Sequence, residues 1–562
     1  MRVNTHSGEL VHYVGAKSSA NYAQYRAYTD GKETVQKQTS SSLRLISGLR
    51  KIASKQFEQV HAQAIEMIQA NVNDPVAYCL LATIAAEYGN HAKAVELFER
   101  AAEIEPQNAY FQAYLGQALT TIGSQREAKS TADKAALLIN SDAYLADTIG
   151  VIYSRTGFHE DAIPFFEKAV KLNPKPANFH YNLGASQQFL GHFERAEKAY
   201  FETLSRDSRA YRAWSSIVGL KRQTPDQNYL PELISLFESL PNDEDASLHL
   251  GHAIAKTMED LGRYEDSFLW LQKAKRLKLK STNSTTFSYD RLFEAAKSAA
   301  TGAMIATDID SERAPIFIIG LPRTGTTLVD RIISSHSDVT AAGELNVFPS
   351  LIKKMAKTAS NMVMDADTFI ASNTFSHEAL ARIGRDYIEA ATELSRGTER
   401  FTDKMPLNFF YAGLILKALP NSRIIALRRG AMDSCLSNYR QLLTVQHSYY
   451  HYTYDLGEIA KFYRQFDQLM SHWRVYLPAN RFIEVTYEDI VHDQESQTRR
   501  LLEFCGLEWQ QSCMRFHENK APVSTASSVQ VRQPLYSGSI GRWQRYGDKL
   551  DGLKQTLGEL AN

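Results

Sequence analysis

A loop bounded by two glycines, Gly320 and Gly325, follows a short apolar run rich in β-branched residues, Pro315 to Ile319. Apolar residues with helical spacing resume from Leu328 to Ser335, so the pattern predicts a strand, a loop and a helix in that order. In such a loop, backbone N–H groups and the positive end of the helix dipole converge on an anion. The pattern therefore predicts a phosphate-binding loop.

The residues inside the loop narrow the choice of anion. Nucleotide hydrolases use G-x-x-x-x-G-K-[ST], in which the lysine reaches the β- and γ-phosphates and the next hydroxyl binds Mg²⁺. Here Thr326 stands where the lysine should be, and a cation returns inside the loop as Arg323. This composition suits a nucleotide with one 5′-phosphate and a small transferable group, and it disfavours a kinase. The alternative is a tight connection without a ligand. The candidate binding residues are Arg323, Thr324, Gly325, Thr326 and Thr327.

The loop sequence Pro-Arg-Thr-Gly-Thr-Thr at 322 to 327 resembles the P-R-S-G-T-T motif of the sulfotransferases that use 3′-phosphoadenosine 5′-phosphosulfate (PAPS). The similarity is to the tyrosylprotein branch of that family, and further segments of the C-terminal half follow in the same chain order. The resemblance implies that a sulfuryl group passes in line from PAPS to an acceptor hydroxyl, without a covalent enzyme intermediate.

A second strand, turn and helix are predicted from Ser422 to Ser437. In the family, an arginine at the strand end and a serine eight residues later bind the 3′-phosphate of the donor, and Arg429 and Ser437 have that spacing. A guanidinium fork and a hydroxyl both suit phosphate geometry. The family usually has Asp-Pro directly after this arginine, whereas this chain has Gly-Ala at positions 430 and 431. Arg428 is an alternative to Arg429, and both arginines could instead be surface residues.

The resemblance also implies three catalytic residues, Arg323, Glu344 and Lys404. Glu344 aligns without a gap with the family's catalytic glutamate, although the preceding glutamate of the family is Gly343 here. A carboxylate at this place would remove the proton of the acceptor hydroxyl. Lys404 would stabilise charge on the bridging oxygen as the S–O bond breaks. The alternatives are that Glu344 caps a helix starting near Leu345 and that Lys404 is a solvated charge.

The resemblance implies two further residues of the PAPS-binding site. Tyr487, at the end of a strand predicted from Arg481, matches a family residue near the adenosine 3′-phosphate. The turn-rich segment Thr525 to Pro534 resembles the one that folds over the nucleotide, and Arg532 occupies the position of its basic phosphate ligand. A mobile lid and an ordinary surface meander are both compatible with its composition.

The acceptor is less defined than the donor. The resemblance favours a tyrosine in a protein or peptide, with a carbohydrate or small-molecule hydroxyl as the alternative. A third reading is a repeat scaffold attached to an inactive nucleotide-binding domain. His447 and His451 lie in an aromatic stretch and offer an alternative base, acceptor-site lining or plain loop packing.

Small residues recur at a fixed spacing through the N-terminal half. Three sets of small residues recur every 34 residues, the period of tetratricopeptide repeats. The sets are Ala82, Gly116, Gly150 and Gly184; Gly89, Gly123, Gly157 and Gly191; and Ala94, Ala128, Ala162 and Ala196. A degenerate repeat is expected from Leu43 to Asn73, and another helical pair from Ala246 to Lys280. Such a solenoid commonly grips peptides on its concave surface. The alternatives are a dimerisation arm, in a homodimer, or a rigid spacer.

Length and composition agree with two domains. The chain has 562 residues, of which 44% are hydrophobic and 22% charged, enough for two cores. We expect an extension at 1–40, an all-α tetratricopeptide solenoid at 41–300, and an α/β P-loop-like domain with a parallel sheet flanked by helices at 312–555.

Composition also excludes several classes. The formal net charge is zero, which disfavours a nucleic-acid binder. No apolar run is long enough to span a membrane, and the first residues do not read as a signal peptide, so we expect a cytoplasmic protein. Four cysteines without metal spacing predict reduced thiols and no metal.

Overall fold

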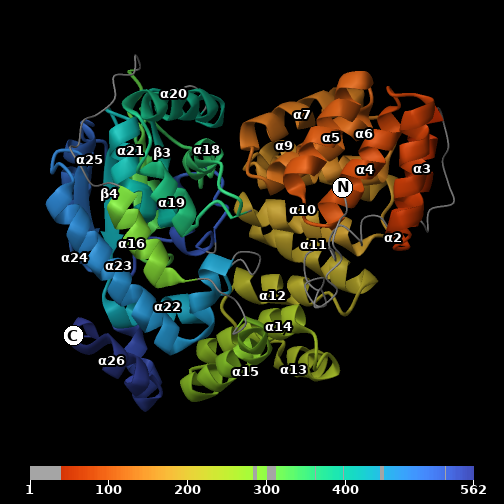
Figure 1. The fold of residues 1–562 in the computed structure, drawn as a ribbon. Coiled ribbons are helices and arrows are strands. Elements are labelled where there is room, and N and C mark those ends of the chain that lie inside the picture. The colour runs from red at the N-terminus through yellow and green to blue at the C-terminus, as the bar shows by residue number, and fades with distance from the viewer. Residues whose placement is uncertain are drawn as a thin grey trace, which may run out of the picture. The chain divides into compact units, whose positions relative to one another are not determined.

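The computed structural model describes most of the chain from Ser40 onward (Figure 1). The described residues are 40–282, 288–299, 312–360, 362–395, 398–443, 448–525 and 527–561. They form two compact units. The first contains the described residues up to Ile122 together with Glu127–Ile152 and Lys168–Pro176, and the second contains Gly123–Arg126, Tyr153–Glu167 and the described residues from Ala177 onward. The predicted extension at 1–40 lies outside the described residues except for Ser40.

Helix follows helix through the N-terminal half (Figure 1). The helices are α2 (Ser40–Ala53), α3 (Phe57–Ala70), α4 (Pro75–Glu87), α5 (His91–Ile104), α6 (Ala109–Thr121), α7 (Gln125–Leu138), α8 (Ala143–Arg155), α9 (His159–Leu172), α10 (Ala177–Phe189), α11 (Phe193–Arg206), α12 (Tyr211–Leu220), α13 (Leu230–Ser239), α14 (Glu244–Asp260), α15 (Tyr264–Thr282) and α16 (Tyr289–Ala299). Short polar residues begin several of them: the side chain of Asp74 accepts hydrogen bonds from the N–H groups of Val76 and Ala77 at the start of α4, as expected of an N-cap.

The predicted glycine period marks the turns between paired helices. Gly89, Gly123, Gly157 and Gly191 all have positive φ, between 76° and 90°, a conformation that glycine adopts without a steric penalty. Inside the pair of α10 and α11, a Cβ on Gly184 would lie 2.8 Å from the ring of Tyr200. Small residues therefore set the close packing of the hairpin, and the predicted all-α repeat region is confirmed.

The C-terminal part contains a five-stranded sheet whose paired neighbours all run parallel. Its strands are β1 (Ile316–Gly320), β2 (Val339–Ala341), β3 (Arg400–Asp403), β4 (Arg423–Arg428) and β5 (Phe482–Thr486). Their order in the sheet is β2-β3-β1-β4-β5. From β1 the chain passes to the edge strand β2 and steps back to β3 beside β1. It then crosses to the other side of β1, where it adds β4 and β5. Ligands of open parallel sheets bind at the carboxyl ends of the strands beside such a reversal.

Helices flank this sheet, as predicted (Figure 1). They are α17 (Thr326–Ile333), α18 (Val347–Ala356), α19 (Ala366–Ser372), α20 (His377–Leu394), η1 (Pro406–Tyr411), α21 (Ala412–Ala418), α22 (Ala431–Arg440), η2 (Ser448–Tyr454), α23 (Leu456–Tyr476), α24 (Tyr487–His492), α25 (Gln494–Cys505), η3 (Gln511–Glu518), η4 (Gln530–Arg532), η5 (Arg542–Leu550), α26 (Asp551–Leu557) and η6 (Gly558–Ala561). Ile316 and Ile318 of β1 pack in one core cluster and Phe317 and Ile319 in another, because successive strand residues point to opposite faces.

The last helical pair packs against the α/β domain. Ala255 of α14 and Phe268 and Leu271 of α15 belong to the same buried cluster as Phe317 of β1. The ammonium of Lys275, itself buried, donates to the carbonyl of Thr453 at 2.7 Å. This pair therefore shares a core with the α/β domain. The predicted domain boundary falls on residues 300–311, which lie outside the described ranges, and it stays a prediction.

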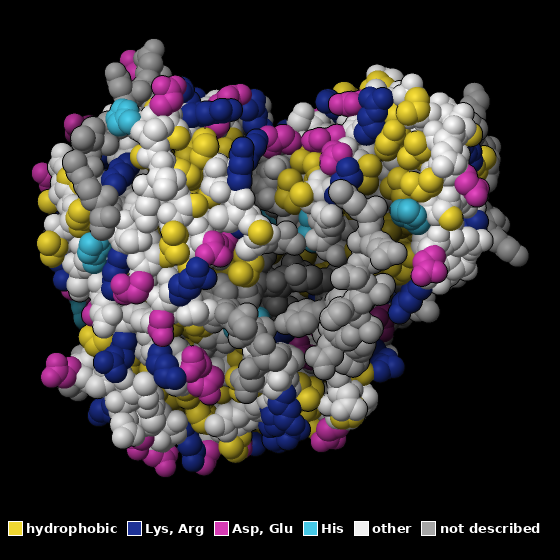
Figure 2. All heavy atoms as spheres, in the orientation of Figure 1, with side chains coloured by type: hydrophobic (Ala, Val, Ile, Leu, Met, Phe, Trp, Pro, Cys, Tyr) yellow, Lys and Arg dark blue, Asp and Glu magenta, His cyan; other side chains and the backbone are white. Residues whose placement is uncertain are grey.

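Both signs of charge are spread over the face of the molecule in Figure 2, where Lys and Arg side chains alternate with Asp and Glu side chains. This distribution agrees with the formal net charge of zero. Among the described residues, no helix has the length and apolarity needed to cross a bilayer. The cellular compartment and the oligomeric state stay predictions.

Candidate active site

A cavity lies at the carboxyl ends of β1 and β4, beside the reversal in strand order. It encloses about 830 Å³ of empty space, a figure that includes open solvent. Seven of the residues expected from the sequence line it: Arg323, Gly325, Thr326, Thr327, Arg429, Ser437 and Tyr487. The structure therefore brings the loop after β1 together with the residues that follow β4 and β5.

Gly325 stands at the N-cap of α17 with a φ of 103°, a conformation that disfavours side chains. A Cβ at this position would lie 2.8 Å from Cδ2 of Tyr487. Tyr487 begins α24 instead of ending β5 as predicted, because its residue pairing in the sheet stops at Thr486. Glycine thus allows both the turn into the helix and the close approach of the Tyr487 ring.

The resemblance implies that the cavity binds 3′,5′-diphosphoadenosine, which is PAPS without its sulfuryl group. Gly325→Ala is expected to weaken this binding by at least about tenfold, because the new methyl must displace a ring that lines the cavity. Titration calorimetry measures this loss. The matched control is Gly89→Ala, which also has a positive φ, of 76°, but no atom within 4 Å of the new Cβ. It should lower the melting temperature and leave nucleotide binding unchanged. If Gly325→Ala and Gly89→Ala bind 3′,5′-diphosphoadenosine with equal affinity, the predicted role of the Tyr487 contact is contradicted.

Arg323 adopts a left-handed backbone with a φ of 69°. Its guanidinium donates to Oγ of Ser527 at 2.5 Å and to Oε1 of Gln530 at 2.8 Å. Burial, together with the nearby Arg440 and Arg429, lowers the pKa of Arg323 to about 10, so the side chain stays cationic at neutral pH. The loop and the segment around η4 are therefore tied together by a charged group that faces the cavity.

Arg429 crosses the cavity floor. Its Nη1 donates to the carbonyl of Arg323 at 3.0 Å, its Nη2 donates to the carbonyl of Ser539 at 2.6 Å, and its guanidinium lies 5.0 Å from the ring centre of Tyr487. Its Nε is buried and has no hydrogen-bond partner among the described residues. Arg428 instead pairs with Asp467 and lies over the ring of Phe466. Of these two arginines, Arg429 lines this cavity and Arg428 does not.

Helix α22 contributes one continuous face to the site. Asp433, Ser437 and Arg440 line the cavity, and they are neighbours because residues three or four apart share a helix face. The carboxylate of Asp433 accepts hydrogen bonds from the N–H groups of Gly541 and Trp543 at 2.6 and 3.1 Å. Arg440 was missed by the sequence analysis, although its place three residues after Ser437 was a usable signal.

The C-terminal segment supplies further cavity residues, among them Ser527, Gln530 and Arg542. Arg532, which the resemblance implied as a phosphate ligand, is not among the described residues that line the cavity. Its Nη2 donates to the carbonyls of Phe189 and Ala521 at 3.1 and 3.3 Å. It thereby fastens the segment to the turn after α10.

Thr324 is likewise absent from the described cavity lining. It is buried, and its hydroxyl donates to the carbonyl of Leu321 at 2.7 Å. Its side chain therefore closes the loop on itself. Thr326 and Thr327, at the first turn of α17, present the helix N-terminus to the cavity, where the helix dipole favours an anion.

Glu344 and Lys404 form an ion pair where β2 and β3 end. The side chain of Lys404 is 3% exposed and that of Glu344 is 40% exposed. The N–H of Lys404 also donates to the carbonyl of Gly343 at 2.9 Å. Helix α18 begins at Val347 with Asn346 as its N-cap, two residues beyond the place where a cap at Glu344 was considered. The carboxylate is therefore engaged by a lysine and open to solvent on its other side.

Neither Glu344 nor Lys404 is among the described residues that line the cavity. Helix α17 connects the two places: Thr326 and Thr327 face the cavity, and one turn later Asp330 accepts a hydrogen bond of 2.5 Å from Thr402 of β3. The candidate site thus combines the cavity at the carboxyl ends of β1 and β4 with a neighbouring carboxylate–lysine pair.

A buried carboxylate, Asp403, supports the segment that carries Glu344. It accepts hydrogen bonds from the hydroxyl of Tyr387 at 2.9 Å and from the N–H of Leu345 at 3.4 Å. Burial raises the pKa of Asp403 to about 8, and the ion pair of Lys404 is with Glu344.

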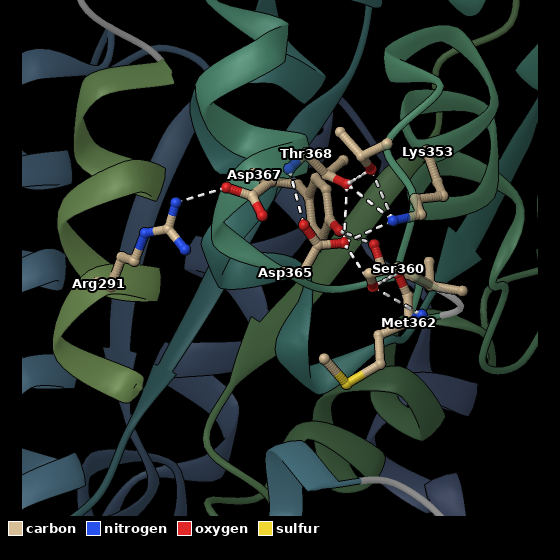
Figure 3. A network of polar contacts seen from close by, with 10 residues as sticks. Arg291, Lys353, Ser360, Met362, Asp365, Asp367 and Thr368 are labelled. Atoms are coloured by element: carbon tan, nitrogen blue, oxygen red, sulfur yellow. Dashed lines mark hydrogen bonds and ion pairs between the residues drawn. The ribbon is translucent and has the colours of Figure 1, made fainter. Parts of the chain in front are cut away.

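The helix that follows Glu344 is held by a polar network (Figure 3). The ammonium of Lys353 on α18 donates to Asp365 at 2.6 Å, and Asp365 also accepts from the N–H and the hydroxyl of Thr368 on α19, each at 2.9 Å. Ser360 donates to the same carboxylate at 3.2 Å. These contacts fix α18 to α19.

The alternative bases receive little support. His447 lies outside the described residues. Burial lowers the pKa of His451 to about 4, and a base that weak removes protons less readily than one matched to neutral pH. Among the described residues, no group of three or more His, Cys, Asp or Glu side chains is arranged to hold a metal ion. All four cysteines are free and buried.

Comparison with known proteins agrees with this geometry. Residues 315–511 match a model described as the sulfotransferase family, and residues 75–108 and 145–176 match tetratricopeptide repeats. An uncharacterized protein of Aquifex aeolicus is 29% identical over 404 residues, covering 70% of this chain and 52% of that protein. The protein-tyrosine sulfotransferase of Drosophila melanogaster is 22% identical over 241 residues, covering 41% of this chain and 46% of that protein.

The chain spans about half the length of these two relatives. Among solved structures, the crystal structure of YrrB, a TPR protein with an unusual peptide-binding site, aligns at 17% identity with a TM-score of 0.26, covering 35% of this chain and 93% of that one. The chain thus combines tetratricopeptide repeats with a sulfotransferase family domain. It is distantly homologous to protein-tyrosine sulfotransferases.

Proposed function

We propose that this protein transfers a sulfuryl group from PAPS to the hydroxyl of a tyrosine in a protein or peptide. The observation that carries the proposal is the cavity at β1 and β4, where Arg323 and Arg429 meet a helix N-terminus without the lysine of an ATP-binding loop. The buried, unpaired Nε of Arg429 fits a ligand that brings a further acceptor.

Each side chain has a role in this proposal. Arg323 and the loop residues Gly325, Thr326 and Thr327 bind the 5′-phosphosulfate end, because backbone N–H groups and a guanidinium neutralise its charge. Arg429, Ser437 and Tyr487 bind the 3′-phosphate side. Thr324 supports the loop from behind. PAPS supplies the sulfuryl group, whose charge is lower than that of a γ-phosphate, so guanidinium and ammonium groups suffice.

Transfer needs a base and a stabilised leaving group. Glu344 takes the proton of the acceptor hydroxyl as the new O–S bond forms. The bond between sulfur and the bridging oxygen breaks at the same time, and Lys404 stabilises the negative charge that develops on the departing phosphate. The ion pair between Glu344 and Lys404 holds the two groups close together before the substrates bind.

Two features support a protein or peptide acceptor. The relatives from Drosophila melanogaster and Danio rerio are named protein-tyrosine sulfotransferases, and tetratricopeptide solenoids commonly bind peptides. Peptides that contain tyrosine should accept the sulfuryl group in the absence of sugars. Activity on carbohydrates but not on peptides would favour the alternative acceptor.

The donor is tested by titrating the purified protein with 3′,5′-diphosphoadenosine and with AMP. We expect the diphosphate to bind at least about 100-fold more tightly, because a second phosphate adds charge-assisted hydrogen bonds. Arg429→Ala should lose about 10- to 100-fold in affinity and most of this preference. The control is Arg428→Ala, which removes the adjacent arginine that pairs with Asp467 and should keep the preference.

Equal affinity for the two nucleotides would reject the donor class and favour the scaffold reading. Loss of the preference in Arg428→Ala, with Arg429→Ala unaffected, would reassign the 3′-phosphate to Arg428.

A further inference from the structure

The cavity receives support from outside the α/β domain, through Glu259 near the end of α14. The Glu259 carboxylate, whose side chain is only 9% exposed, accepts a hydrogen bond of 2.7 Å from Nε of Arg440 and a second from Nη2. It also lies 3.6 Å from Nη1 of Arg542. Both arginines line the cavity, so one carboxylate engages two cavity guanidiniums.

The two arginines need such a partner. Arg440 and Arg542 share the cavity with Arg323 and Arg429, and like charges in close proximity repel one another. The carboxylate of Glu259 accepts from Arg440 and lies at ion-pair distance from Arg542, so it restricts both side chains and less side-chain entropy is lost when a phosphate binds. Glu259 thereby holds the two guanidiniums, which are hydrogen-bond donors, in place before a ligand enters the cavity.

The face of α14 that carries Glu259 is directed at α22. His252, seven residues earlier and on the same helix face, donates from Nδ1 to the carbonyl of Arg440 at 3.1 Å. Arg440 is therefore held by α14 at both its backbone and its side chain.

The docking of α14 does not depend on Glu259 alone. That docking rests on the apolar cluster shared by Ala255, Phe268 and Leu271 and on the bond from Lys275 to the carbonyl of Thr453. Buried ion pairs contribute little net stability, since desolvation offsets their attraction. Removing one partner of such a pair nevertheless leaves the other charge buried and unpaired, so the stability of each variant is measured alongside its binding.

We propose that Glu259 is a positioning residue for donor binding, which holds Arg440 and Arg542 in the orientation that receives the donor's phosphates. The inference rests on the proposed function. It makes a helix of the N-terminal helical region part of the donor site, so the α/β domain alone would bind its donor poorly.

The test compares Glu259→Gln with Glu265→Gln in the full chain. Glutamine keeps the size but offers one acceptor oxygen, so it cannot serve two guanidiniums. We expect Glu259→Gln to raise the Kd for 3′,5′-diphosphoadenosine and the KM for PAPS about tenfold, with kcat within about twofold. Glu265 pairs with Lys549 at 2.9 Å, an exposed contact between α15 and η5, so its variant should change neither constant.

A double-mutant cycle separates positioning from a general loss of structure. On an Arg440→Ala background, Glu259→Gln should raise the Kd by less than about threefold, because its main partner is already gone. An unchanged Kd in the single variant, tighter binding, or an equal tenfold loss on both backgrounds would overturn the proposal. If Glu259→Gln does not fold, Glu259→Asp replaces it, with an expected loss of about threefold because the shorter carboxylate reaches one guanidinium.

The same variants are also titrated with inorganic pyrophosphate, which needs the arginines but no adenosine. If the unaltered protein binds pyrophosphate but not 3′,5′-diphosphoadenosine, the proposed donor is wrong. In that case the change in pyrophosphate affinity caused by Glu259→Gln still tests whether Glu259 positions the arginines. If the unaltered protein binds neither, both proposals fail.

Discussion

Glu344→Gln should lower turnover by about 10²- to 10⁴-fold, the usual contribution of a general base, and change donor affinity by less than about twofold. Glutamine keeps an oxygen that accepts from Lys404, so the contact between the two side chains can persist. Donor affinity should be spared because Glu344 is not among the described residues that line the cavity. The measurements are initial rates with PAPS and a tyrosine peptide, and titration with 3′,5′-diphosphoadenosine.

The acidity of the acceptor gives a sharper test of the same residue. A more acidic phenol parts with its proton more easily, so it depends less on a base. With peptides containing fluorinated tyrosines, the loss caused by Glu344→Gln should shrink as the phenol pKa falls. Turnover equal to that of the unaltered protein would remove Glu344 from the mechanism. A large loss that is independent of phenol acidity would assign it a role other than proton removal.

Local pattern was enough to predict the elements that build the site. The apolar run before Gly320 predicted a strand, and the structure has β1 at Ile316–Gly320. Helix α17 begins at Thr326, two residues before the expected start, because Gly325 already turns the chain into the helix. The 34-residue period of small residues likewise predicted the repeat helices, because the spacing of small residues along the chain indicates where paired helices pack closely.

Contacts between distant segments were beyond the reach of local pattern. Arg323 meets Ser527 and Gln530 across about 200 residues of sequence, and no spacing rule relates these positions. Arg532 illustrates the same limit, since its place in a turn-rich segment did not reveal its bonds to the carbonyl of Phe189. The choice between Arg428 and Arg429 depended on their partners in distant segments, which are Asp467 for Arg428 and the carbonyls of Arg323 and Ser539 for Arg429.

The helical pair of α14 and α15 shows a further limit. Its sequence resembles a repeat, and the structure has helices there. Its apolar face nevertheless packs with Phe317 of the sheet domain in one core, because an amphipathic helix carries no information about which apolar surface covers it. Glu259 could not be linked to the cavity from the sequence for the same reason.

Lys404→Met should lower kcat by about 10²- to 10³-fold, the cost of removing one preorganised charge from a developing anion. Since Lys404 acts on the leaving group, the loss should be the same for acidic and ordinary phenols, in contrast to Glu344→Gln. Rates with the same fluorinated tyrosine peptides provide the comparison.

The buried position of Lys404 requires a control for the loss of a lysine from a folded ion pair. Lys353→Met serves, because it leaves Asp365 without its lysine in the network of Figure 3; we expect it to lower the melting temperature while kcat stays within about twofold. A comparable loss of kcat in both variants would attribute the effect of Lys404→Met to destabilisation instead of to the leaving group.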